Sequence, residues 1–288
     1  MSTCPEGPDT NVPCELELES NPVHVKLIMI GDKKPSQIET KPKADLFSVS
    51  VAIPALNEAG NITSAVKATK DALEKHGFSD FEIILIDGGS SDGTPKIMDE
   101  IGSQDGRIKV GPHIISRGLG HSVTHGFSCA TKQYVGWFPG DNETLPETMK
   151  NVFAEIGKVD VIIPYTVNPW VRTPGRRILS AVYLKTFNAV FGTRLKYFNG
   201  PCFFRRPVLD TVIMSTDGPA YMMEILVQLV KSGEASYVEV PMYLKARDYG
   251  KSSVLKWGNV WEIAKTAAKL FFRIHFCGLP KKGGVDGN

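Results

Sequence analysis

Short apolar runs that each end in an acidic or glycine-rich segment constrain the fold of this chain more than any other feature. Three such runs cover 47–53, 81–86 and 134–138. Helical periodicity separates them, and strands that alternate with helices indicate a mainly parallel sheet. The carboxyl ends of parallel strands meet at one edge of a sheet, where ligands bind. We therefore predict an α/β fold with a ligand site at that edge.

The remaining pattern is typical of one large α/β domain with extensions, for which 288 residues suffice. Hydrophobic periodicity predicts helices over 61–76, 94–101, 119–131, 146–157, 175–191 and 220–231. Further strands are predicted over 108–110, 159–164 and 237–240, with 196–206 passing back through the sheet. The predicted sheet is therefore mixed and mainly parallel, with helices on its flanks.

The two ends of the chain differ from its middle in charge. Residues 1–22 hold five acidic and no basic side chains, and residues 245–282 hold nine basic and two acidic ones. We divide the chain into a flexible acidic extension and linker over 1–45, with an extra strand at 23–30, a main domain over 46–253 and a basic segment over 254–288. The asymmetry predicts that the basic segment meets an anionic partner. A net charge of +2 gives no reason to expect a nucleic acid.

The basic segment includes a predicted helix over 255–274. Its apolar stripe includes Trp257, Trp261 and Phe271, with Lys265 and Lys269 on the opposite face. A basic amphipathic helix with aromatic residues suits a membrane interface, and packing against the core is the alternative. We find no signal peptide and no apolar run long enough to span a bilayer. The five scattered cysteines imply no disulfide framework. We expect a cytoplasmic protein, peripheral at most at the membrane face.

The first two strand ends hold candidate ligands for a nucleotide. Pro54 fixes the backbone where the first strand ends, so that Asn57 and Glu58 can face a base or ribose. Asp87 ends a buried strand, where a carboxylate is poor for stability but useful for binding. Local roles are the alternative, because carboxylates are favoured at helix N-termini and Asp92 can cap the helix that follows it.

Two further motifs suit a diphosphate and a metal ion. Asp141 and Glu143 follow the run at 134–138, and acids two apart in a turn can both bind Mg²⁺ or Mn²⁺. A solvated turn is the alternative. Arg117, Gly118 and Gly120 open a predicted helix, whose free backbone N–H groups suit phosphate oxygens. This incomplete glycine pattern disfavours a dehydrogenase.

The order of these motifs resembles that of the family 2 glycosyltransferases, which transfer a sugar from a nucleotide sugar on a GT-A fold. The resemblance implies that Asp141 and Glu143 stand at the family's Asp-x-Asp metal motif, with Asp141 also a catalytic and nucleotide-sugar residue. It implies nucleotide-sugar contacts for Pro54, Asn57, Glu58, Asp87, Arg117, Gly118 and Gly120. Gly88 departs from the family pattern, which usually has a second acid there.

The C-terminal motifs resemble the dolichol-phosphate mannose synthase branch, whose enzymes act on polyprenyl phosphates. They are a Glu-bearing apolar helix with Glu224, a Glu-Val-Pro segment at 239–241, an Arg-x-x-Gly-x-Ser segment at 247–252, and a loose match at 199–206. The resemblance implies a catalytic role for Arg247 and a base or arginine-partner role for Glu224. The implied ligands of the acceptor phosphate are Arg205, Arg247, Lys251 and Ser252, because basic side chains match phosphate oxygens.

Together these features predict an inverting, metal-dependent transfer from a UDP- or GDP-sugar to a polyprenyl phosphate. An ionised phosphate needs no strong base, whereas a hydroxyl acceptor needs a carboxylate, for which Glu224 and Asp217 are candidates. One alternative is therefore transfer to a hydroxyl in cell-envelope glycan or secondary-metabolite synthesis. Another is a non-catalytic nucleotide-sugar-binding protein. A sugar-phosphate nucleotidyltransferase is disfavoured because 54–60 contains no glycine-rich arginine loop.

Overall fold

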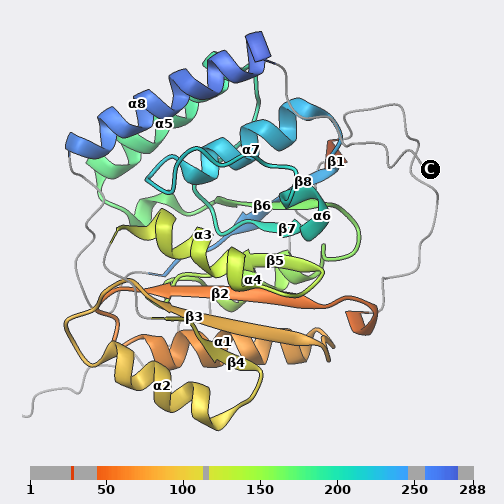
Figure 1. Cartoon of the computed structure of the whole chain (residues 1–288), viewed down its shortest axis with the longest axis vertical. Helices are drawn as coiled ribbons and strands as arrows, with labels where there is room; N and C mark the ends of the chain where they lie inside the picture. Colours follow the sequence, from red (N-terminus) through yellow and green to blue (C-terminus); the bar gives the residue numbers. More distant parts are fainter. Residues whose placement is uncertain (1–26, 29–43, 113–116, 246–256, 278–288) are drawn as a thin grey trace, which may run out of the picture.

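The computed structural model describes residues 27–28, 44–112, 117–245 and 257–277, built around an eight-stranded sheet with the order β1-β8-β6-β7-β5-β2-β3-β4 (Figure 1). The strands are β1 (Leu27–Ile28), β2 (Val49–Ala55), β3 (Phe81–Asp87), β4 (Ile108–Val110), β5 (Tyr134–Trp137), β6 (Val161–Thr166), β7 (Phe203–Arg205) and β8 (Tyr237–Met242). Strand β7 is antiparallel to β5 and β6, and β1 is antiparallel to β8. The other described pairings are parallel, so the predicted mixed, mainly parallel sheet is confirmed.

Helices cover both faces of this sheet. They are α1 (Ile62–Lys75), α2 (Thr94–Gln104), α3 (Leu119–Cys129), α4 (Pro146–Phe153), α5 (Pro174–Phe191), α6 (Arg206–Leu209), α7 (Tyr221–Ser232) and α8 (Trp257–Phe272). Short 3-10 turns span Ala44–Leu46 and Pro169–Val171, and a π-helical turn, Arg273–Cys277, continues α8. The predicted C-terminal helix is therefore present.

Successive side chains of the central strands point to opposite faces of the sheet and belong to two separate hydrophobic clusters. Val51 and Ile53 of β2 pack in the cluster with residues of α1, α2 and α4. Ala52, between them, points to the opposite face and packs with residues of α3, α5, α7 and α8. Every residue of β2 and β3 is buried, as expected for strands enclosed between two helical layers.

Helix α3, which follows β4, packs directly on the sheet. A Cβ atom on Gly126 would stand 2.6 Å from the Cβ of Ala52, so only glycine allows α3 to approach β2 this closely. This contact fixes α3 over the centre of the sheet, and the N-terminus of α3 then lies at the carboxyl edge.

Two boundaries differ from the sequence prediction. Helix α4 ends at Phe153 rather than at 157, because the next backbone hydrogen bonds, from Glu155 to Val152 and from Ile156 to Phe153, span three residues instead of four. Of the strand predicted at 23–30, Leu27–Ile28 pair with β8, although they belong to the range that we assigned to a flexible extension. The rest of 1–43 lies outside the described residues.

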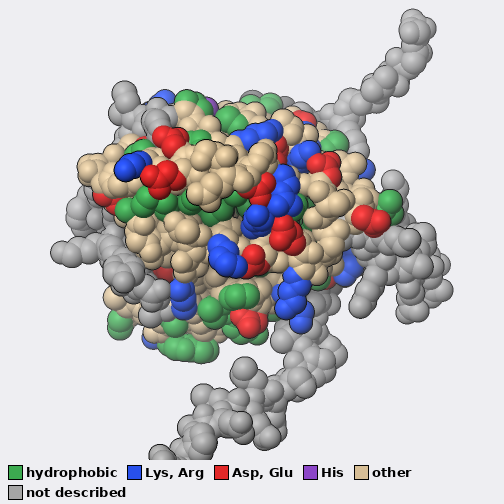
Figure 2. All heavy atoms as spheres, turned by 90° about the horizontal axis from the view of Figure 1, so that it is seen from below, with side chains coloured by type: hydrophobic (Ala, Val, Ile, Leu, Met, Phe, Trp, Pro, Cys, Tyr) green, Lys and Arg blue, Asp and Glu red, His purple; other side chains and the backbone are tan. Residues whose placement is uncertain are grey.

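The end of the molecule formed by α1 and α2 mixes acidic and basic side chains (Figure 2). Lys67 pairs with Asp71 along α1, and Arg107 pairs with both Glu74 and Asp105. Exposed pairs of this kind contribute little stability. They leave no extended patch of one charge on this face, which therefore does not suit an anionic ligand.

Candidate active site at the carboxyl edge of the sheet

The loops that follow β2, β3 and β5 are joined by backbone hydrogen bonds. The N–H of Gly88 donates to the carbonyl of Ala55 at 2.8 Å, and the N–H of Gly140 donates to that of Pro54 at 3.1 Å. A Cβ on Gly140 would lie 2.8 Å from the Cβ of Ala55, so the third loop approaches β2 only as glycine. The three strand ends singled out by sequence therefore form one continuous surface.

Asn57 ties the first two loops together. Its φ of +56° is left-handed, a conformation that asparagine tolerates better than most residues. Its Oδ1 accepts the backbone N–H of Ser91 at 2.8 Å, and its own N–H donates to the Oγ of Ser90 at 2.9 Å. Asn57 was predicted to face the nucleoside, and the structure adds a structural role between the loops.

Asp92 performs a second linkage between the same loops. Its Oδ1 accepts from the N–H and hydroxyl of Thr94, and its Oδ2 accepts from the N–H of Ala59. Burial acts to raise the pKa of Asp92, but these hydrogen bonds outweigh it and hold the pKa below its ordinary value. The N-cap position of α2 is Gly93, but Asp92, the residue before it, accepts the N–H of Thr94, the first residue of the helix, so Asp92 does satisfy a free N–H at the start of α2 as predicted.

The two predicted nucleoside carboxylates are both buried at this edge. Asp87 is 2% exposed and accepts the N–H of Ser90 at 3.1 Å. Glu58 is 9% exposed and accepts from the Nδ2 of Asn61 at 2.7 Å. Burying a carboxylate is costly unless hydrogen bonds satisfy it. These contacts hold both side chains in place beside the loop surface.

The Asp141–Glu143 loop is a tight turn. Asn142 has a left-handed φ of +57°, and the N–H of Glu143 donates to the Oδ1 of Asp141 at 3.0 Å. The carbonyl of Glu143 accepts the N–H of Lys245, which attaches the turn to the segment after β8. No cluster of three or more acidic, histidine or cysteine side chains in the described residues could hold a metal. These two carboxylates therefore fit only an ion that completes its shell with water and phosphate, as Mg²⁺ commonly does.

A third group gathers at the N-terminus of α3. Gly118, with φ of +97°, starts the helix, and Arg117 lies 3.3 Å from the Oδ2 of Asp217. The Nδ1 of His121 lies 2.7 Å from the same oxygen. A Cβ on Gly120 would lie 2.3 Å from the carbonyl oxygen of Asp217. The loop before α7 therefore packs on the first turn of α3 and brings a partly exposed carboxylate to the site.

The side chain of Glu224 holds the loop before α7 in place from the protein interior. The side chain is fully buried and accepts from the N–H and hydroxyl of Ser215 and from the N–H of Thr216. Arg273, after α8, lies 3.5 Å from its carboxylate. Of the two roles expected for Glu224, the structure supports the arginine partner. A carboxylate enclosed in this way cannot reach an acceptor hydroxyl.

Arg205 stands away from the site. Strand β7 runs antiparallel to β5 and places Arg205 opposite Tyr134, the first residue of β5, at the amino edge of the sheet. There it lies 3.6 Å from Asp160. The predicted contact between Arg205 and the acceptor phosphate is therefore corrected. Arg247, Lys251 and Ser252 lie outside the described residues.

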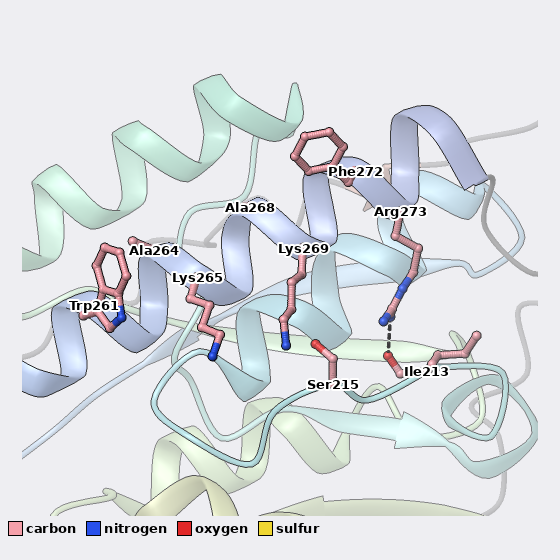
Figure 3. Close-up of a pocket in the computed structure, with 9 residues that line it drawn as sticks. All are labelled: Ile213, Ser215, Trp261, Ala264, Lys265, Ala268, Lys269, Phe272 and Arg273. Atoms are coloured by element: carbon pink, nitrogen blue, oxygen red, sulfur yellow. Dashed lines mark hydrogen bonds between the residues drawn. The ribbon is translucent and has the colours of Figure 1, made fainter.

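An open groove of about 990 Å³ runs along α8, beside the loop before α7 (Figure 3). It is lined by Ile213, Ser215 and side chains of α8 and its continuation, and Arg273 donates to the carbonyl of Ile213 at 2.7 Å. Trp261 and Phe272 are 74% and 61% exposed.

Among the described helices, none is long and apolar enough to cross a membrane.

The family model for glycosyl transferase family 2 matches residues 50–213, which contain every strand end of the loop surface. The chain belongs to glycosyl transferase family 2. A relative among known proteins, the undecaprenyl-phosphate 4-deoxy-4-formamido-L-arabinose transferase of Enterobacter sp. (strain 638), is 23% identical over 219 residues. The alignment covers 74% of this chain and 64% of that relative, so it spans less than two thirds of the relative's length.

Solved structures of glucosyl-3-phosphoglycerate synthase from Mycobacterium tuberculosis share the fold. One, in complex with Mn²⁺, UDP-glucose and phosphoglyceric acid, is 18% identical with a TM-score of 0.58 and covers 90% of both chains. Another, with Mg²⁺ and UDP, is 16% identical with a TM-score of 0.55 and covers 83% of both chains. These likenesses establish the GT-A fold, as predicted.

Proposed function

We propose that this family 2 glycosyltransferase moves a sugar from a nucleotide-diphosphate sugar to a phosphate-bearing acceptor, with a polyprenyl phosphate as the favoured acceptor. The observation that supports the proposal is the joining of the loops that bear Asp87 and Asp141 at the carboxyl edge of the sheet, where α3 also begins after Arg117. The undecaprenyl-phosphate relative supports the acceptor.

We assign the nucleoside, the diphosphate and the metal ion of the bound donor to different residues of this edge. Asp87 and Glu58 would face the nucleoside, and the N-terminus of α3 with Arg117 would bind the diphosphate. Asp141, with Glu143, would hold Mg²⁺ or Mn²⁺. Such an ion offsets the charge of the leaving nucleoside diphosphate. Solved relatives bind Mn²⁺ or Mg²⁺ together with UDP, which supports this assignment.

Transfer then depends on positioning and charge stabilisation. An acceptor oxygen attacks the anomeric carbon from the side opposite the diphosphate, so the configuration inverts. An ionised phosphate oxygen needs no proton removed, which agrees with the enclosure of Glu224.

A hydroxyl acceptor is the second candidate, and one observation favours it. Asp217 is within hydrogen-bond distance of His121 at the site, and a carboxylate paired with an imidazole can accept a proton from a hydroxyl. The glucosyl-3-phosphoglycerate synthase that holds phosphoglyceric acid is a solved relative of this fold. Its acceptor, like a polyprenyl phosphate, bears a phosphate.

We also propose that the enzyme docks on an anionic membrane surface through α5 and α8, which run next to each other in Figures 1 and 3. Ile178 and Val182 of α5 are 66% and 56% exposed, and Trp261 of α8 is 74% exposed. Lys265 and Lys269 line the groove on the side of α8 that faces the loop before α7 (Figure 3). Exposed apolar groups with lysines on the same helix suit a peripheral position at the cytoplasmic membrane face.

A transfer assay tests the proposed function. Full-length protein with Mn²⁺ or Mg²⁺ is given a panel of UDP- and GDP-sugars, with and without a short prenyl phosphate. We expect lipid-dependent release of UDP or GDP that Asp141→Ala abolishes and that the surface variant Asp71→Ala retains. Donor binding with no release to any acceptor would indicate a non-catalytic nucleotide-sugar-binding protein instead.

A further inference from the structure

We propose that Arg172 and Lys196, set against the rings of Tyr197 and Tyr165, form a phosphomonoester-binding subsite at the carboxyl end of β6. The inference rests on the proposed function and assigns the acceptor's phosphate to residues that sequence motifs did not single out. It replaces Arg205, which lies at the opposite edge of the sheet.

The end of β6 lies next to the Asp141–Glu143 turn. Asn168, two residues after β6, donates its Nδ2 to the carbonyl of Leu244 at 2.7 Å and accepts the N–H of Leu244 on its Oδ1 at 3.1 Å. Leu244 in turn forms a β-bridge with Thr144, directly after the turn. One extended segment therefore separates the end of β6 from the proposed metal ligands, so an acceptor bound there would stand beside the donor.

Arg172 has an N–H group that lacks an acceptor. One terminal nitrogen donates to the hydroxyl of Tyr197 at 3.0 Å, and the guanidinium carbon lies 5.7 Å from the centre of that ring. The Nε is buried without a hydrogen-bond partner, and no carboxylate of the described residues pairs with this side chain. Buried polar groups in folded proteins are nearly always satisfied, so the unmet N–H indicates a ligand oxygen.

Lys196 provides the second positive charge. Its Nζ lies 4.1 Å from the centre of the Tyr165 ring, the residue before the end of β6. Glu239 accepts the backbone N–H of Lys196 and so fixes this segment, and its carboxylate also interacts electrostatically with Lys196. A ring beneath a cation orients it without neutralising its charge.

The two cations come from segments that meet at the same strand end. A Cβ on Gly200 would lie 2.3 Å from the carbonyl oxygen of Pro164 and 3.4 Å from the ring of Tyr197. The segment 196–200 is therefore pressed against the last residues of β6. Thr166, which ends β6, has a buried hydroxyl without a partner in the described structure.

This set of donors matches a phosphomonoester. A planar guanidinium and an ammonium suit a group with two negative charges and three terminal oxygens. Two acceptors share this chemistry, a lipid phosphate and a small phosphorylated acid. With a lipid phosphate, its oxygen forms the bond to the anomeric carbon while the bond to the nucleoside diphosphate breaks. With a small acid, the phosphate only anchors, a hydroxyl attacks, and its proton passes to the Asp217–His121 pair.

Calorimetric titration tests the subsite without requiring turnover. The full-length chain, alone and with UDP and Mn²⁺, is titrated with phosphoglyceric acid and, separately, with a short prenyl phosphate. We expect Arg172→Gln and Lys196→Gln each to weaken binding of the preferred phosphomonoester by at least about tenfold, with the affinity for UDP unchanged within about twofold. Tyr197→Phe, which keeps the ring, should weaken it less.

Arg194→Gln is the matched control. Arg194 is exposed, and its substitution removes one positive charge two residues from Lys196. Variants no weaker than this control would overturn the subsite. Wild-type protein that binds UDP but neither phosphomonoester would also overturn it while leaving donor binding intact. If the wild-type protein does not bind UDP at all, that result would instead count against the proposed function. The acceptor that binds more tightly identifies the source of the phosphate.

Discussion

The Nδ1 of His121 lies 2.7 Å from the Oδ2 of Asp217, although 96 residues separate them in sequence. The contact joins the first turn of α3 to the loop before α7, and Glu224 fixes that loop from the other side. The proposed diphosphate site and the segment beside α8 are thereby connected through one loop.

Gly120 permits the approach of this loop, so Gly120→Ala should displace it. The added Cβ would lie 2.3 Å from the carbonyl oxygen of Asp217, a backbone atom that cannot move alone. We expect a loss of about 1–3 kcal/mol in the free energy of unfolding, together with weaker UDP binding. Denaturant titration and calorimetry measure the two effects. Gly106→Ala is the control, because its Cβ would meet nothing within 4 Å. Equal effects of the two substitutions would contradict the account.

Asn142 should be replaceable by glycine but not by alanine. Its φ of +57° costs a residue with a Cβ about 1–2 kcal/mol, and glycine adopts it freely. Because the turn presents both proposed metal ligands, Asn142→Ala should weaken Mn²⁺ binding in the presence of UDP by several-fold, whereas Asn142→Gly should leave it near the wild-type value. Mn²⁺ titration followed by electron paramagnetic resonance gives the comparison. Equal affinities in the two variants would show that the turn does not set the metal site.

Glu82 should make folding stability depend on acidic pH. It is 2% exposed at the amino edge of the sheet. Burial acts to raise its pKa, but hydrogen bonds from Lys109, Ser50 and Thr131 outweigh burial and lower the pKa from 4.5 to about 2. A pKa lower in the folded state stabilises the fold above pH 4.5, and this contribution is lost as the pH falls from 4.5 towards 2.

The size of this effect is on the order of 3 kcal/mol at neutral pH. Glu82→Gln should therefore be less stable than the wild type at neutral pH, and the difference should shrink as the pH falls through this window. Unfolding free energies measured across the window for both proteins check it. Parallel pH profiles for the two proteins would refute the assignment.

The proposed membrane face predicts aromatic-dependent binding to vesicles. Trp261→Ser and Phe272→Ser each remove a large apolar side chain that is 74% and 61% exposed, respectively. We expect each to reduce cosedimentation with anionic vesicles by about tenfold, and salt to weaken binding further. Leu46→Ser, at a position that is 67% exposed before β2, is the control. Binding that survives both aromatic substitutions would exclude this face as the docking surface.

The sequence predicts the sheet edge well because alternation of strands and helices determines which ends of parallel strands meet. Asp87 and Asp141 follow such strands, and the structure places their loops in contact. Arg205 was misplaced because its strand returns antiparallel, and a short apolar run does not reveal its direction. The sign of its charge gave no information about the edge on which it lies.

Contacts between distant segments explain what sequence reasoning missed. Asp217 was considered only as a base, because nothing in its local pattern shows that His121 faces it. The role of Asn57 between two loops depends on Ser90 and Ser91, which read locally as ordinary turn residues. An Asn-Glu pair follows both strands, at Asn57 and at Asn142, and because asparagine tolerates the left-handed φ that both adopt, this pair was the sequence signal for a constrained turn.

Metal-dependent nucleotide binding at Asp141 tests the central claim most directly. The affinity of the full-length protein for UDP and for GDP is measured by calorimetry with and without Mn²⁺, in the wild type and in Asp141→Asn. The account predicts that Mn²⁺ tightens binding of one nucleotide by at least about tenfold in the wild type and has little effect in the variant. Two results would contradict the account. In one, Mn²⁺ changes nucleotide affinity equally in the wild type and in Asp141→Asn. In the other, neither Mn²⁺ nor the substitution changes that affinity.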